Sequence, residues 1–202
     1  MGTSASEPRL GLRERNRART YAEITDAALE LFERQGFDAT TVDQIASAAG
    51  VSPATFFRYF ATKEDVLFTD EDASAAELVA DVADRTDRRT SSVSALTEPI
   101  VAFAEKMPGP TSPHSRELTT LVMTTPSLAA RSLRIRLRWE RDVAVQLANE
   151  DGLATPTLRH TAVASAAVSC LASGLRHWPN SSPSTLAPLV REAFEHVIGR
   201  VD

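Results

Sequence analysis

Cysteine is almost absent from this sequence of 202 residues, in which Cys170 is the only one. A single thiol cannot form a disulfide within the chain, so packing must hold the fold together. The four histidines (114, 160, 177 and 196) lack the short spacing of a helical metal site. No glycine-rich phosphate loop and no nucleophile elbow occurs either. We therefore expect no metal, no cofactor and no catalytic centre.

Long apolar runs are missing as well. No window reaches the run of about 18 apolar residues that a transmembrane helix requires, and residues 1–10 lack the apolar centre of a signal peptide. We expect a cytoplasmic protein without a membrane partner. Hydrophobic residues make up 43% of the chain and charged residues 24%, which is typical of a folded globular protein.

Negative charge dominates overall, with a net charge of −5, but its distribution is uneven. Residues 1–20 contain five arginines and two glutamates, a balance of +3, whereas residues 64–202 contain 14 basic and 19 acidic residues, a balance of −5. A basic end on an acidic body is typical of a protein that meets phosphate at one end only. We interpret residues 1–20 as a basic N-terminal arm, and a merely solvated tail is the alternative.

The apolar spacing predicts an all-α fold, because it is close to 3.6 residues wherever it is clear and period-two alternation is not sustained. An apolar stripe over residues 21–32 predicts a helix that stops at Gly36. Further helices are expected from residue 62 to about 85 and over residues 91–107, with a kink at Pro99. The remaining ones are expected at about 115–124, 127–149, 157–178 and 185–200.

Two short helices between residues 41 and 60 form the most informative local pattern. Thr41 and Gln44 make a capping box that opens the first, and Ser52 followed by proline opens the second. Between them, Gly50 can adopt a left-handed backbone and Val51 can lock the pair. This is typical of a helix-turn-helix, whose second helix enters the major groove of DNA.

The surrounding residues carry a family pattern. It comprises Ile24-Thr-Asp-Ala-Ala-Leu-Glu-Leu-Phe32, Gly36-Phe37, Thr41-Val42, Ile45-Ala46, Ala49-Gly50-Val51-Ser52 and Thr55-Phe56-Phe57-Arg58-Tyr59-Phe60 before Lys63-Glu64. This pattern resembles the N-terminal domain of the TetR family of bacterial transcriptional regulators. The resemblance implies a three-helix DNA-binding domain over residues 21–66 and a helical effector-binding and dimerisation domain over residues 67–202.

The same resemblance assigns roles to individual side chains. Arg58 would read guanine, which contributes about 1–3 kcal/mol of discrimination. Position 57 is phenylalanine, where many relatives have tyrosine, so a hydroxyl contact with phosphate is lost there. For Phe56 and Phe60 we expect core positions, and Tyr59 and Lys63 have ordinary surface roles as alternatives. The predicted DNA contacts are Thr41, Ser52, Ala54, Thr55, Arg58, Tyr59, Lys63, Arg17 and Arg19.

For the larger domain the resemblance implies a dimer, and two segments support it. Residues 161–174 are dominated by alanine and serine, and the last helix carries a continuous apolar stripe. Two such helices from each subunit would form a four-helix bundle, unless they pack within one subunit. The predicted interface residues are Ala164, Val168, Leu171, Leu186, Leu189, Val190, Phe194 and Val197.

An effector site is less well specified. The candidate pocket residues are Phe103, Met107, Leu121, Met123, Trp139 and Trp178, each with plain core as the alternative. Arg134, Arg138 and Arg141 share a helix face. They form either a solvated face paired with Glu140 and Asp142 or a site for an anionic group, such as the phosphates of an acyl-coenzyme A.

Taken together, these features predict a repressor. As a dimer it would bind a pseudo-palindromic operator in double-stranded DNA, with recognition helices about 34–36 Å apart, and a hydrophobic or anionic small molecule would release it. One alternative is a DNA-binding protein of the same fold that a protein partner or abundance controls. A second is an enzyme that retains the helix-turn-helix without using it.

Overall fold

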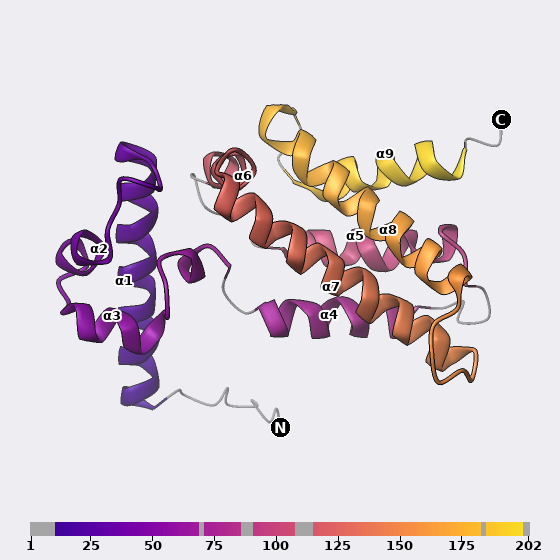
Figure 1. Ribbon diagram of the computed structural model, residues 1–202, viewed down its shortest axis with the longest axis horizontal. Coiled ribbons are helices and arrows are strands. Elements are labelled where there is room, and N and C mark those ends of the chain that lie inside the picture. The colour runs from indigo at the N-terminus through magenta and orange to yellow at the C-terminus, as the bar shows by residue number, and fades with distance from the viewer. Residues whose placement is uncertain (1–10, 69–70, 86–90, 108–114, 183–184, 200–202) are drawn as a thin grey trace, which may run out of the picture. The chain divides into compact units, whose positions relative to one another are not determined.

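The computed structural model describes residues 11–68, 71–85, 91–107, 115–182 and 185–199 (Figure 1). All regular structure in these ranges is helical, with no strand, which confirms the all-α prediction. The chain divides into two compact units, residues 1–69 and 70–202. The boundary predicted after residue 66 falls within the first unit, at the end of a short 3-10 turn. None of the described helices has the length and apolarity to cross a membrane.

The first unit is a three-helix arrangement around a small core. It contains α1 (Leu12–Gln35), α2 (Val42–Ala48), α3 (Pro53–Tyr59) and the 3-10 turn η1 (Glu64–Val66). Its fully buried side chains include Ile24, Ala28, Ile45 and Phe56. One aromatic or aliphatic anchor from each helix is therefore removed from water, and this burial fixes α3 on α1 and α2.

The basic N-terminal arm is shorter than predicted, because α1 already begins at Leu12. Residues 12–20 contain arginine, glutamate and alanine without proline or glycine, and these residues favour a helix. The Glu14 carboxylate accepts a hydrogen bond from the Gly11 backbone N–H at 3.0 Å, which caps the helix start. Arg17 and Arg19 therefore lie on a helix, and the part of the predicted arm before residue 11 lies outside the described residues.

The second unit is a larger helical domain with one hydrophobic core. Pro99 lies in the first turn of α5, where its missing N–H breaks no helical hydrogen bond, so the predicted kink does not occur. The elements are α4 (Glu71–Ala83), η2 (Ser94–Leu96), α5 (Thr97–Lys106), α6 (Ser115–Thr124), α7 (Pro126–Glu150), α8 (Leu158–His177), η3 (Trp178–Asn180) and α9 (Ala187–Ile198).

Two of these helices, α8 and α9, pack against each other (Figure 1). Gly174 of α8 lies at a point of close approach. A Cβ atom at this position would lie 2.8 Å from Cγ2 of Val190. Glycine is therefore required here by the packing of α9, since the position is an ordinary helical one with no positive φ. One turn away, Cys170 is buried, and desolvation raises the pKa of its thiol, which disfavours the reactive thiolate.

Charged pairs hold α4 against α7. Arg85, two residues after the end of α4, is almost fully buried and places both terminal nitrogens on the Glu150 carboxylate, at 3.0 and 2.5 Å. Near the other end of α4, Arg131 donates its Nε–H to Glu71 at 2.7 Å. A buried pair is costly to break because it leaves one charge without a partner. These contacts therefore fix the position of α4 within the second unit.

Candidate nucleic-acid interface

The turn between α2 and α3 has the predicted geometry. Gly50 adopts a positive φ of 66°, and the N–H of Val51 donates to the carbonyl of Ala46 at 2.9 Å, which closes the end of α2. At the start of α2, the N–H of Gln44 donates to the Thr41 hydroxyl at 3.3 Å, and Gln44 accepts in return from the Thr41 N–H at 2.9 Å. The predicted capping box is confirmed.

This arrangement leaves Thr41 available for a further contact. Its side chain is exposed at the N-terminus of α2, and its hydroxyl oxygen accepts a hydrogen bond from Gln44. The hydroxyl hydrogen can still donate, and the helix N-terminus favours negative charge. A phosphate oxygen is therefore a suitable partner for this position.

The start of α3 is organised by Ser52. Its hydroxyl accepts from the Thr55 N–H at 3.1 Å and lies 3.0 Å from the Thr55 hydroxyl. Pro53 occupies the first turn, as predicted. The two hydroxyls therefore hold each other at the N-terminal end of the recognition helix, beside exposed Ala54.

Behind this polar edge, α3 is anchored by aromatic side chains. Phe56 is fully buried and Phe60 is 3% exposed, which confirms the expected core positions. Their rings lie 5.6 Å apart, and Phe60 also contacts Tyr21 of α1 at 4.9 Å. Phe57, in contrast, is 55% exposed and projects from the same helix without a polar group. Such anchoring leaves the other face of α3 rigid and accessible.

The accessible face carries one guanidinium group. Arg58 is exposed and its terminal carbon lies 5.3 Å from the centre of the half-buried Tyr59 ring. Within the described part of the chain Arg58 forms no ion pair, so its donors are available for a base or a phosphate. The ring beneath it restricts the orientations that the long side chain can adopt.

The Lys63 side chain, predicted to contact phosphate, forms hydrogen bonds within the protein. Its ammonium group donates to the carbonyls of Phe37 at 2.6 Å and Thr40 at 2.8 Å, and it lies 4.2 Å from the centre of the Phe37 ring. Two of its three N–H donors are thereby used inside the protein. A lysine in sequence predicts a positive charge, but only the fold determines where that charge is directed.

The N-terminal turns of α1 add exposed positive charge to this unit. Arg17 and Arg19 are both exposed, and Arg19 forms a weak exposed pair with Glu23 at 3.5 Å. Exposed pairs of this kind exchange readily for phosphate contacts, because water screens them. The helix-turn-helix and these arginines together have the composition of a DNA-binding surface.

Two family models match this chain. Residues 24–69 match the model described as bacterial regulatory proteins of the tetR family, and residues 90–202 match the MftR C-terminal domain. The chain belongs to the TetR family of bacterial regulators. Members of the family that it resembles are transcriptional regulators and not enzymes, so the expectation of a non-enzyme is confirmed.

A curated relative matches almost the whole chain. It is the Mycobacterium tuberculosis protein MftR, whose name describes it as a mycofactocin biosynthesis transcriptional regulator, with 30% identity over 97% of this chain and 96% of its own length. Among solved structures, FadR of Thermus thermophilus in complex with lauroyl-CoA has 21% identity and a TM-score of 0.52, over 90% of this chain and 95% of its own. FadR of Bacillus halodurans has 20% identity and a TM-score of 0.59, over 90% and 100%. At these identities the structures establish the TetR fold.

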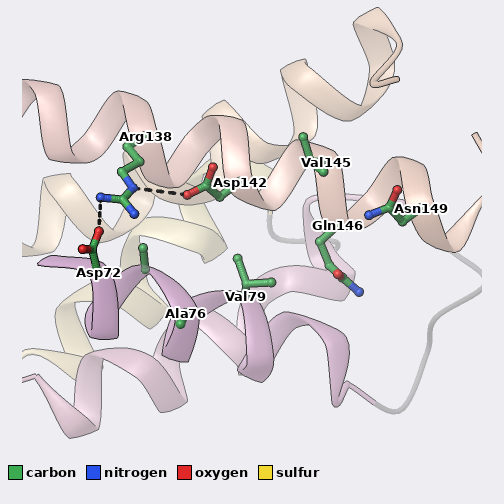
Figure 2. Close-up of a pocket in the computed structure, with 9 residues that line it drawn as sticks. Asp72, Ala76, Val79, Arg138, Asp142, Val145, Gln146 and Asn149 are labelled. Atoms are coloured by element: carbon green, nitrogen blue, oxygen red, sulfur yellow. Dashed lines mark ion pairs between the residues drawn. The ribbon is translucent and has the colours of Figure 1, made fainter. Parts of the chain in front are cut away.

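The predicted pocket residues are distributed between the core and the surface of the second unit. Phe103, Trp139 and Trp178 are buried in the core, with Met107 packed against it at the end of α5. On α6, Leu121 is half-buried and Met123 is 36% exposed. A groove of about 380 Å³ lies elsewhere, between α4 and α7 (Figure 2), lined by Asp72, Ala75, Ala76, Val79, Arg138, Asp142, Val145, Gln146 and Asn149.

The arginine-rich face of α7 is largely paired. Arg138 lies between Asp72 at 2.6 Å and Asp142 at 3.5 Å, as Figure 2 shows. The hydrogen bond to Asp72 is the main cause that raises the pKa of Arg138. Arg141 contacts Asp142 at 3.0 Å, and Arg134 is exposed. These contacts favour the solvated, paired face over an anion site.

Most of the predicted dimer residues point into the subunit itself. Leu189 is half-buried, and Val197, at 56% exposed, is fully accessible on α9. The other six have exposed fractions of 4% or less, and they pack between α8 and α9 of one chain. The alternative of packing within one subunit therefore holds for Ala164, Val168, Leu171, Leu186, Val190 and Phe194.

Proposed function

We propose that this TetR-family regulator is a homodimeric repressor that binds a pseudo-palindromic operator and is released by a small-molecule effector. The observation that carries the proposal is the accessible face of α3. Ser52, Thr55 and Arg58 occupy this face while Phe56 and Phe60 fix the opposite face in the core. A rigid helix with exposed donors at its N-terminal end is the element that reads base edges in the major groove.

We assign base readout and phosphate contacts to different groups. Arg58 has the fork of donors that matches guanine, and Thr55 can contact a base or a thymine methyl. The Thr41 hydroxyl, the Tyr59 hydroxyl and the arginines at positions 17 and 19 would contact phosphate, which supplies affinity without sequence information. Ala54 is small enough to allow close approach, and Ser52 would keep its cap while lying near the groove.

The dimer surface that we propose is the outer face of α8 together with α9. On α8, Ala162, Ala166, Ser169 and Ser173 recur at helical spacing and are exposed or half-exposed. On α9, accessible Val197 continues a stripe from half-buried Leu189. Small side chains allow two helices to approach closely, and an isologous pairing of both helices would bury this face.

For the effector we propose an apolar molecule held in the core of the second unit. A buried aromatic cluster that includes Phe103 and Trp139, with ring centres 5.4 Å apart, is the chemistry of a largely hydrophobic site. Thermus thermophilus FadR was solved with lauroyl-CoA, which makes an acyl-coenzyme A a sound first probe. Control by a protein partner or by abundance is the alternative, and a thermal shift with specific ligands would separate the two.

A footprint tests the proposal. Purified protein is incubated with its own upstream region and with upstream regions of mycofactocin biosynthesis genes, which the name of the M. tuberculosis relative suggests. We expect a protected pseudo-palindrome whose affinity falls steeply with salt. The Arg58→Ala variant should lose sequence preference, and Arg134→Ala, an exposed arginine of the other unit, is the matched control. If no DNA region shows salt-sensitive protection, the proposed repressor function is refuted.

A further inference from the structure

Two indole N–H groups are buried in the second unit without an acceptor among the described residues. Within the described residues, neither the indole N–H of Trp139 nor that of Trp178 has a hydrogen-bond partner. Trp139 is 9% exposed and Trp178 is 3% exposed, and they are the two tryptophans of the chain. A buried indole N–H normally finds an acceptor, because leaving it unpaired costs free energy. These two groups therefore call for an explanation beyond packing.

Each ring packs against a side chain that offers no hydrogen-bond acceptor. The Trp139 ring on α7 meets Phe103 of α5 edge-on, at 5.4 Å and 84°. Trp178 in η3 is covered on its face by the Arg116 guanidinium, whose carbon lies 5.8 Å from the ring centre. Both rings belong to one contiguous hydrophobic core. This core would therefore favour a ligand with a largely apolar surface and at least one hydrogen-bond acceptor.

The helix that covers this part of the core is weakly anchored. Among its described side chains α6 has none that is buried, whereas α4, α5, α7, α8 and α9 each contribute several. It packs on α7, α8 and η3 through half-buried residues, among them Leu118 and Leu121. An element with little buried apolar surface opens at low cost in free energy. Opening of α6, which packs on η3, therefore offers a low-cost route toward Trp178.

We propose that the effector is an apolar carbonyl compound, a ketone, ester or thioester, whose oxygen accepts a hydrogen bond from the indole N–H of Trp139 or Trp178. This inference rests on the proposed function and specifies the chemistry of its effector. The carbonyl would supply the missing acceptor, and its apolar body would displace α6 from the core. A hydrocarbon of the same shape would leave both donors unpaired and would bind less well.

The test uses two isosteres that differ only in the acceptor, acetophenone and α-methylstyrene. With two tryptophans in the chain, a ¹⁵N–¹H spectrum of the full-length protein contains two indole cross-peaks, and Trp139→Phe and Trp178→Phe assign them. We expect acetophenone to move at least one indole proton downfield and to bind about fivefold to tenfold more tightly than α-methylstyrene, the contribution of one hydrogen bond. In the phenylalanine variant of the responding residue, this preference should disappear.

Two results would overturn the inference: no indole proton that responds to acetophenone, or equal affinity for both isosteres in the wild-type protein. Neither result depends on a variant that folds. Operator binding is measured separately on the same sample. Failure of the wild-type protein to bind any operator would refute the repressor, and the isostere comparison would still decide whether the indoles recognise a carbonyl.

Discussion

The ammonium group of Lys63 donates to the backbone carbonyl of Phe37 at 2.6 Å, across 26 positions of the chain. A second bond reaches the carbonyl of Thr40 at 2.8 Å, and the charge lies over the Phe37 ring at 4.2 Å. Lys63 thus connects the end of the helix-turn-helix to the loop between α1 and α2. Charge-assisted hydrogen bonds of this kind stabilise by about 1.5–3 kcal/mol.

Replacement of Lys63 distinguishes a role in stabilising the fold from a role in contacting DNA phosphate. We expect Lys63→Met to lower the melting temperature, because both carbonyls lose their donor while the apolar stem is kept. The slope of log affinity against log salt should stay unchanged, since a phosphate contact contributes about 0.9 to that slope. Arg17→Gln, which removes an exposed arginine, is the control that should reduce the slope. A reduced slope for Lys63→Met with unchanged stability would restore the phosphate role.

Phe57 lies where many relatives of this family carry tyrosine, and the structure leaves its ring 55% exposed on α3. A hydroxyl added at this edge would have access to the DNA backbone without disturbing the core. We expect Phe57→Tyr to raise operator affinity by about 0.5–1.5 kcal/mol, the range of one hydrogen bond. Fluorescence anisotropy at fixed salt measures this change. Phe57→Leu controls for the apolar contact, and equal affinity of the tyrosine and leucine variants would exclude a hydroxyl contact.

Local signals explain why the helix-turn-helix was predictable from sequence. The capping box at Thr41, the positive φ at Gly50 and the cap at Ser52 each depend on residues within about four positions of one another. Such interactions are encoded in short segments and tolerate changes elsewhere in the chain. The burial of Phe56 and Phe60 followed from the same helical spacing.

Long-range packing explains what sequence reasoning missed. The apolar stripe of α9 was correctly placed on a helix, but the pattern does not reveal whether a stripe faces its own subunit or a second one. Val190 and Phe194 are fully buried in one chain. The two tryptophans are pocket candidates from sequence, yet only the fold shows that their N–H groups have no partner among the described residues. For α1, the extension to Leu12 was missed because residues 12–20 carry no apolar stripe.

The proposed dimer surface can be tested at Val197, which is 56% exposed on α9. We expect Val197→Glu to shift the protein toward a monomer in sedimentation, because a carboxylate would be buried between subunits without a partner. The melting temperature extrapolated to low protein concentration should change little. Operator affinity should fall, because a monomer holds one half-site only.

Leu137→Glu is the matched control for this experiment. Leu137 is 52% exposed, close to Val197 in accessibility, but it lies on α7. We expect this variant to remain dimeric. Dissociation of Leu137→Glu together with a stable dimer of Val197→Glu would place the interface on α7 and contradict the proposed pairing through α8 and α9.

The close packing of α8 on α9 gives the last prediction, at Gly174. A Cβ here would lie 2.8 Å from Cγ2 of Val190, 3.2 Å from its backbone nitrogen and 3.2 Å from Cδ1 of Leu186. Alanine would gain about 0.5–1 kcal/mol from helix propensity, but overpacking of a fixed core costs about 1–3 kcal/mol. We therefore expect Gly174→Ala to destabilise the protein, and to lower its melting temperature by several degrees in calorimetry.

Two further variants separate the clash from helix propensity in this measurement. Ala130→Gly, at an exposed position of α7 outside the proposed dimer surface, gives the propensity contribution alone. Gly174→Ala combined with Val190→Ala removes the nearest methyl group, so the double variant should lose less stability than the two single changes add up to. Additive losses, or a Gly174→Ala protein more stable than the wild type, would mean that α9 can move away from α8. In that case the two helices would be held together less tightly than their distance of approach implies.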